Sequence, residues 1–261
     1  MAADGDVVTV VRACRWAGNS RRSYYYRPTQ AKPRINEHLA ARVKRVISDL
    51  PYAGYRTVAW LLGENKNTIQ QGLAGAQALQ WSPPPGAGIT FGGLAPARWA
   101  TDIARVWCGP VHRWCALTIV MDCHTREALG WRLSPSGNAK AAEAALEEAL
   151  ITRHGTLGRA QDPITLRSDK SLVFTSRHYT RKVCQYGLKQ EFIRPHTPQQ
   201  NGMVERLIRT VKEQCLWLHN FQSLDEARQT LRAWFKYYNE QRPHQALGIK
   251  TPSTVYQQLA A

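Results

Sequence analysis

The spacing of hydrophobic residues along the chain changes after residue 98. Before that point, apolar residues recur every three or four positions, as in helices that bury one face. The segments with this spacing are 35–50, 55–62 and 67–79. The first two are separated by Pro51-Tyr52-Ala53-Gly54, where proline and glycine interrupt any regular element. The pattern therefore predicts three short helices in the first part of the chain.

From Trp99 on, short apolar runs typical of buried strands alternate with longer helical patterns. Strands are predicted at 99–107, 114–122, 128–133, 163–168 and 189–194, and helices at 138–152, 176–186, around Glu205 and at 223–240. Three strands in succession, followed by alternating helices and strands, describe a mixed five-stranded sheet flanked by helices. The expected fold class is α/β.

The same patterns suggest where domains meet. Residues 82–98 are rich in proline and glycine and are predicted to form a linker. The helices before it, within 31–81, suit a small helical DNA-binding module. Residues 1–30 are either a basic leader or part of a helix-turn-helix. Residues 99–261 then form a core domain with helices at its C-terminal end.

Composition narrows the class of partner. The formal net charge is +16 and the isoelectric point is about 9.9, which favours a nucleic acid or another anionic partner. No apolar run approaches the roughly 18 residues that span a bilayer, and the N-terminus shows no secretory signal, so a cytoplasmic protein without membrane contact is expected. The six cysteines are scattered without the spacing of a zinc module, which indicates reduced structural thiols.

Three acidic residues carry the candidate chemistry. Asp102 lies within a predicted strand, Asp169 ends another, and Glu205 lies early in a predicted helix, with thirty-five residues between Asp169 and Glu205. Carboxylates are the ligands that Mg²⁺ prefers, and a pair of such ions can drive phosphoryl transfer on nucleic acid. Asp122 also ends a predicted strand, but the sequence after it predicts a turn, so it is interpreted as a turn residue.

The helix of Glu205 supplies candidate DNA contacts. Glu205, Arg209 and Lys212 follow at helical spacing and share one face. A carboxylate followed by two cations suits a metal site beside a phosphate backbone, although an ordinary exposed helix face has the same pattern. Arg206 and Asn201 are further candidate DNA contacts on this segment.

At these residues the chain resembles bacterial insertion-sequence transposases with a retroviral-integrase-like DDE core. The resemblance covers about residues 98–256. It rests on Trp99-Ala100-Thr101-Asp102, on Arg167-Ser168-Asp169, on Pro198-Gln199-Gln200-Asn201-Gly202-Met203-Val204-Glu205, on the 35-residue spacing and on the tail Tyr238–Gly248.

This resemblance implies a ribonuclease H-like integrase core with strand order 3-2-1-4-5, preceded by the small helical module. It implies Asp102, Asp169 and Glu205 as catalytic acids that bind two divalent ions, Mg²⁺ or Mn²⁺. It also implies double-stranded DNA as partner, at transposon ends and target, with a homo-oligomer assembled on it.

One departure from the family follows the second aspartate. The family usually has Asn-Gly there, where this chain has Lys170-Ser171. Glycine tolerates a positive φ more readily than serine, and Lys170 brings a cation beside the expected metal. A strained turn and weakened activity are therefore expected.

Three functions remain open from the sequence. The leading hypothesis is a DDE transposase that cleaves transposon ends and joins them to another strand. The second is a catalytically eroded, DNA-binding transposase remnant. The third is a ribonuclease H-like nuclease acting on RNA–DNA hybrids, against which the N-terminal helical module argues.

Overall fold

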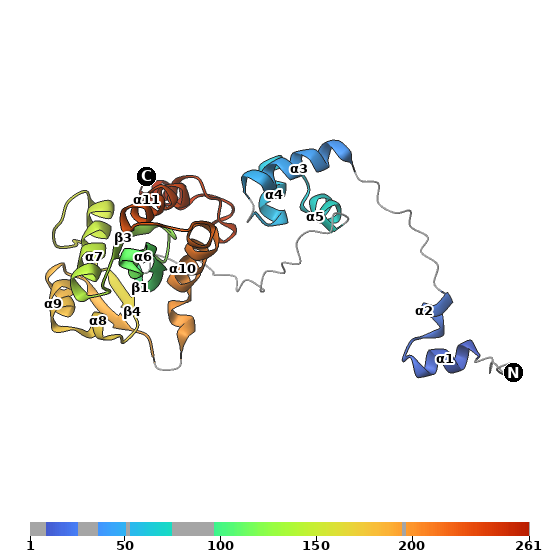
Figure 1. Ribbon diagram of the computed structural model, residues 1–261, viewed down its shortest axis with the longest axis horizontal. Helices are drawn as coiled ribbons and strands as arrows, with labels where there is room; N and C mark the ends of the chain where they lie inside the picture. The colour runs from blue at the N-terminus through green and yellow to red at the C-terminus, as the bar shows by residue number, and fades with distance from the viewer. Residues whose placement is uncertain (1–8, 26–35, 51–52, 75–96, 195–196, 261) are drawn as a thin grey trace.

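The fold was analysed in a computed structural model, which describes residues 9–25, 36–50, 53–74, 97–194 and 197–260 (Figure 1). The predicted linker at 82–98 lies outside the described residues except for its last two positions. Within the described ranges, no helix is both long and apolar enough to cross a membrane.

The first part of the chain is helical, as its hydrophobic spacing predicts. Two short helices, α1 (Val10–Trp16) and α2 (Arg21–Tyr25), precede the three helices α3 (Glu37–Asp49), α4 (Tyr55–Leu62) and α5 (Lys66–Ala74). Asn36 begins α3 by accepting a hydrogen bond from the Leu39 N–H, and Gly63 ends α4 with a φ of 67°. The three helices α3–α5 share a small core made of Val43, Ala53, Val58, Ala59 and Ile69.

The second part is built on a five-stranded sheet. Its strands are β1 (Arg98–Trp107), β2 (Trp114–Asp122), β3 (Ala128–Ser134), β4 (Thr165–Ser168) and β5 (Lys189–Phe192). The spatial order is β3-β2-β1-β4-β5, in which β2 runs antiparallel to both β1 and β3, while β4 runs parallel to β1 and β5 runs parallel to β4. The expected order 3-2-1-4-5 and the α/β ribonuclease H-like class are confirmed.

Helices cover both faces of this sheet (Figure 1). One face packs against α7 (Ala139–His154), α8 (Leu172–Thr175) and α9 (Arg177–Gln185), and the other against α10 (Gly202–Gln214) and α11 (Leu224–Glu240). Helix α7 lies so close to β3 that a Cβ at Gly130 would stand 2.2 Å from the Ala145 carbonyl oxygen. Strand β2, which lies between β3 and β1, is buried on both faces, and this explains its continuous apolar run.

Several short elements were not predicted. They are α6 (Gly109–His112), η1 (Pro198–Asn201), η2 (Leu216–Leu218), η3 (Gln245–Leu247) and α8, and each has three or four residues. One helical turn is too short for a hydrophobic period to develop. The last helix, α12 (Pro252–Ala260), belongs to the predicted C-terminal helices.

Candidate active site

Strand pairing brings the two aspartates together. Strands β1 and β4 run parallel, with Ala100 opposite Arg167. Two residues further along the chain from this pair are Asp102, within β1, and Asp169, which directly follows the end of β4. The register therefore brings the two aspartates near one another although 66 residues separate them in the sequence, and the charge of Asp169 acts on Asp102.

The third acid, Glu205, is carried by helix α10 and not by the sheet. It occupies the first turn of α10, whose buried residues Val204, Leu207, Ile208 and Val211 pack on the sheet. Because these residues form one stripe of the helix, Glu205 is left on the exposed part of its surface. Packing of α10 thus decides where the third carboxylate lies.

The charges of Asp169 and Glu205 both act on Asp102. The pKa of Asp102 is raised from 3.8 to about 6, mainly by burial, and the charges of Asp169 and Glu205 contribute to this rise. The Ile103 N–H, which donates to Asp102 Oδ1 at 2.8 Å, and the ammonium of Lys212 oppose that rise. A group of mutually repelling carboxylates is a site that a cation would stabilise.

The carboxylates are nevertheless not gathered as metal ligands. Among the residues that the structure describes, no three Asp, Glu, His or Cys side chains lie close enough to share one ion. The chemistry of the donors fits a hard divalent cation, because three carboxylate side chains supply oxygen ligands and negative charge. The donor types therefore fit Mg²⁺ or Mn²⁺, while the side chains stand apart.

The predicted DNA contacts fall into two environments. Arg206 and Arg209 are exposed on α10, where Arg209 pairs with Glu213 at 2.7 Å. Lys212, on the same helix, is half-buried and acts electrostatically on Asp102. Asn201 differs from these, since it is only 3% exposed and its Nδ2 lies 3.5 Å from the Thr101 carbonyl oxygen, which accepts its hydrogen bond. A buried side chain cannot touch DNA where it stands, so its predicted contact would require a rearrangement.

Arg167 on β4, which was not among the predicted site residues, connects this strand to the segment before the Glu205 helix. The Arg167 guanidinium donates to Glu191 Oε2 at 3.0 Å and to the Gln200 carbonyl oxygen at 2.8 Å. The available signal was an arginine two residues before Asp169, in a short strand whose other residues are uncharged. The sequence could not identify its partners Glu191 and Gln200, because they lie 24 and 33 residues further along the chain.

The turn after Asp169 does not have the strain that the departure from the family suggested. Ser171 has a φ of −63°, an ordinary extended conformation, and its N–H donates to Asp169 Oδ1 at 3.1 Å. Lys170 is exposed. The expectation of backbone strain at Lys170-Ser171 is wrong, because this turn does not require a positive φ.

Asp122 is a turn residue, as interpreted from the sequence. Its Oδ1 accepts hydrogen bonds from the N–H groups of His124 and Thr125, and its Oδ2 pairs with Arg153 at 2.8 Å. The same guanidinium also pairs with Glu127 at 2.8 Å. These bonds hold the turn between β2 and β3 against the end of α7, on the opposite face of the sheet from α10.

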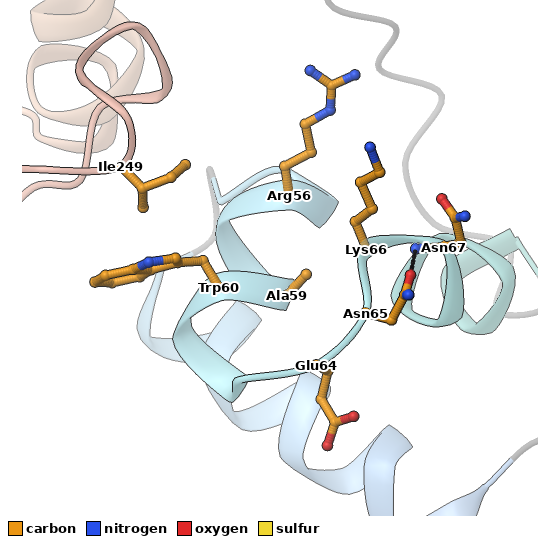
Figure 2. Close-up of a pocket in the computed structure, with 8 residues that line it drawn as sticks. All are labelled: Arg56, Ala59, Trp60, Glu64, Asn65, Lys66, Asn67 and Ile249. Carbon is orange, nitrogen blue, oxygen red and sulfur yellow. Dashed lines mark hydrogen bonds between the residues drawn. The ribbon is translucent and has the colours of Figure 1, made fainter.

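The helical module has a surface feature of its own. A hollow of about 520 Å³ opens where α4 turns into α5, with Arg56, Trp60, Lys66 and Asn67 among its lining residues (Figure 2). The two helices are joined by only three residues after Leu62, and Asn65 begins α5 by accepting a hydrogen bond from the Asn67 N–H at 2.9 Å. Lys66, Asn67, Thr68 and Gln70 are exposed on α5, while Ile69 is buried in the core of the module.

Two family models match the chain. Both are described as integrase core domain, and they cover residues 94–198 and 186–252. The first contains Asp102 and Asp169, and the second contains Glu205. Together they span the whole sheet and the helix α10.

Similar sequences and structures have also been found. Transposase InsD for insertion element IS2A/D/F/H/I/K of Escherichia coli is 26% identical over 237 residues, covering 84% of this chain and 78% of that protein. Transposase InsD for insertion element IS2 on the F plasmid of Escherichia coli (strain K12) matches with the same values. The catalytic core domain of BIV integrase aligns with a TM-score of 0.48 and 17% identity, over 64% of this chain and 97% of that one. The HTLV-2 integrase catalytic core in complex with magnesium (trimeric form) aligns with a TM-score of 0.43 and 15% identity, over 62% and 98%.

Proposed function

Because the chain belongs to the integrase core domain family, we propose that it is a DNA transposase. It cleaves a phosphodiester bond at the end of a transposon and joins the released 3′-OH to target DNA. The observation that carries this proposal is the common region of Asp102, Asp169 and Glu205, in which both neighbours raise the pKa of Asp102. The similar Escherichia coli proteins are transposases of insertion elements, which supports this proposal.

The three carboxylates are the residues that would hold the divalent ions. Two ions, Mg²⁺ or Mn²⁺, would supply activation of the attacking oxygen and stabilisation of the leaving oxygen. Asp102 is fixed within a paired strand, so its backbone cannot shift without breaking the register with β2. Asp169 is held by the Ser171 N–H, and Glu205 is carried by a helix packed on the sheet.

The basic residues of α10 are proposed to bind the DNA backbone next to this site. Lys212 is close enough to Asp102 to act on its pKa, so a phosphate held by its ammonium lies near the acids. Arg206 and Arg209 extend the basic surface along the exposed face of the helix. The cations offset the repulsion that a phosphate would meet at three carboxylates.

The helical module is proposed as a second DNA contact. Helices α4 and α5 are joined by a tight turn at Gly63, as in a helix-turn-helix. The exposed side chains at the start of α5 are Lys66, Asn67, Thr68 and Gln70, which can bond to phosphates and base edges. Double-stranded DNA is thus the proposed partner of both parts, and the protein would act on it in the bacterial cytoplasm as a homo-oligomer.

The test is an assay of 3′-end cleavage and strand transfer with the inverted repeats that flank the element, in Mg²⁺ or Mn²⁺. The proposed function predicts metal-dependent products that disappear in Glu205→Gln. DNA binding without any products would instead support the eroded remnant. Cleavage of RNA–DNA hybrids without strand transfer would support the nuclease.

A further inference from the structure

We propose that Arg167 and Asn201 are positioning residues that set the place of Glu205 relative to the two aspartates. This inference rests on the proposed function, because it concerns the same three acids. The two side chains bond the segment Gln200-Asn201 to both strands that carry the aspartates. Glu205 follows four residues later, on the first turn of the helix that begins at Gly202.

The bond to the strand of Asp169 is made by Arg167. Its side chain is 16% exposed and its guanidinium donates in two directions, from Nη1 to the Gln200 carbonyl oxygen at 2.8 Å and from Nε to Glu191 Oε2 at 3.0 Å. The Arg167 guanidinium is also the main reason that the pKa of Glu191 is lowered. A charged, forked donor held by a carboxylate is well suited to fix a single carbonyl group.

The bond to the strand of Asp102 is made by Asn201. Its side-chain amide donates to the carbonyl oxygen of Thr101, the residue immediately before Asp102. Asn201 is 3% exposed and Thr101 is completely buried, so water cannot easily replace this bond. One pair of consecutive residues, Gln200 and Asn201, is therefore tied to β4 and to β1 at once.

A third bond closes the loop before this pair. The side-chain Oε1 of Gln200 accepts a hydrogen bond from the Arg194 N–H at 2.9 Å. Arg194 follows shortly after β5, whose residue Glu191 is the second partner of Arg167. Gln200, which lies just before α10, is thus held at two points: its carbonyl oxygen accepts from Arg167, and its side chain accepts from the Arg194 N–H.

These bonds matter because α10 is rigid over one turn. A shift of Asn201 is carried to Glu205, which lies about 6 Å further along the helix axis at 1.5 Å per residue. A misplacement of about 1 Å at a reacting group can cost on the order of a hundredfold in rate. Groups that orient metal-binding side chains commonly contribute about 10- to 100-fold in metal affinity.

The chain offers a matched control. Arg98 also pairs with Glu191 Oε2, at 3.7 Å, but makes no hydrogen bond to Gln200 within the part of the chain that the structure describes. Arg167→Met and Arg98→Met each remove one arginine from the same carboxylate, and only the first releases the Gln200 carbonyl group. Arg167→Lys serves as a second variant that keeps the charge beside Glu191 but lacks the fork needed for both bonds.

Two measurements on the full chain test the proposal. Hydrogen–deuterium exchange without metal should be faster over residues 198–207 in Arg167→Met and Arg167→Lys than in the wild type and in Arg98→Met. Titration calorimetry with Mn²⁺ should show affinity about tenfold weaker in the two Arg167 variants and unchanged in Arg98→Met. High Mn²⁺ should restore strand transfer in Arg167→Lys, whereas Glu205→Gln should stay inactive.

The opposite results separate this inference from the proposed function. Wild-type exchange and wild-type Mn²⁺ affinity in both Arg167 variants would overturn the positioning role alone. Faster exchange with unchanged Mn²⁺ affinity would show a merely structural bond and would overturn it as well. If the wild-type chain bound no Mn²⁺ and joined no DNA, the proposed function would fall, and the positioning role with it.

Discussion

Lys212 on α10 lies close enough to Asp102 on β1 to oppose the rise of its pKa to about 6. This relationship connects the basic face of α10 to the buried carboxylate, and it depends on the packing of the helix against the sheet. Lys212 therefore links the basic face of α10 to the proposed chemistry.

For the carboxylates, Asp102→Asn, Asp169→Asn and Glu205→Gln should each abolish cleavage and joining. Each change removes a negative charge at nearly constant volume, so binding of divalent ions is lost while the fold is kept. Products would be measured on labelled transposon-end DNA, with DNA binding measured in the same samples. Near-wild-type strand transfer in Glu205→Gln would show that this residue is not one of the three acids.

Removal of the α10 cations should weaken binding of DNA in a salt-dependent way. Lys212→Ala and Arg209→Ala are each expected to reduce the magnitude of the slope of log affinity against log salt by about one, because each removes one phosphate contact. Arg181→Ala, an exposed arginine on α9 at the other face of the sheet, is the control and should leave the slope unchanged. If all three variants kept the wild-type slope, this face of α10 would not contact DNA.

At the turn after Asp169, Lys170→Asn with Ser171→Gly should not increase activity. Ser171 has a negative φ, so glycine relieves no strain and instead adds freedom to the unfolded chain, at a cost of about 0.5–1 kcal/mol. Thermal unfolding and strand-transfer rates of the two proteins would be compared. A marked gain in rate would mean that the Lys170 charge, rather than the backbone, limits the natural sequence.

The contribution of His244 to the stability of the core should fall as the pH decreases from about 6.5 towards 3, opposite in sign to that of Asp102, whose pKa is raised to about 6. Burial lowers the pKa of His244 from 6.5 to about 3, and the neighbouring Arg242 and Arg126 act in the same direction. Between these two values the unfolded chain binds the proton and the folded chain does not, so stability rises with pH across this window. His244→Gln should flatten that part of the curve of unfolding free energy against pH, and an unchanged slope would assign it to other groups.

The two parts of the chain should separate on limited proteolysis. The helical module and the sheet domain have distinct clusters of buried residues, and the Pro/Gly-rich segment 82–98 lies between them in the sequence. Early cleavage is expected between residues 75 and 98, and a fragment beginning near residue 95 should keep the unfolding transition of the core. Early cuts inside 99–194 instead would contradict this division.

Much of this protein could be predicted from local patterns. Strands 114–122 and 99–107 could be predicted because alternating or continuous apolar runs indicate burial on one or both faces. Helices α7 and α11 could be predicted because a long segment shows the helical spacing of its apolar residues clearly. The three acids were found from their residue types, their neighbours and their spacing. The turn role of Asp122 also followed from the residues next to it in the chain.

Tertiary structure alone decided which of these residues act together. The parallel pairing of β1 and β4 places Asp102 beside Asp169, and the packing of α10 brings Lys212 to the same carboxylate. Asn201 is buried against Thr101, and Arg167 holds the Gln200 carbonyl group, through bonds between residues 100 and 33 positions apart. Such bonds leave no periodic trace in the sequence, because burial and hydrogen-bond partners at long range depend on the three-dimensional arrangement of all the elements.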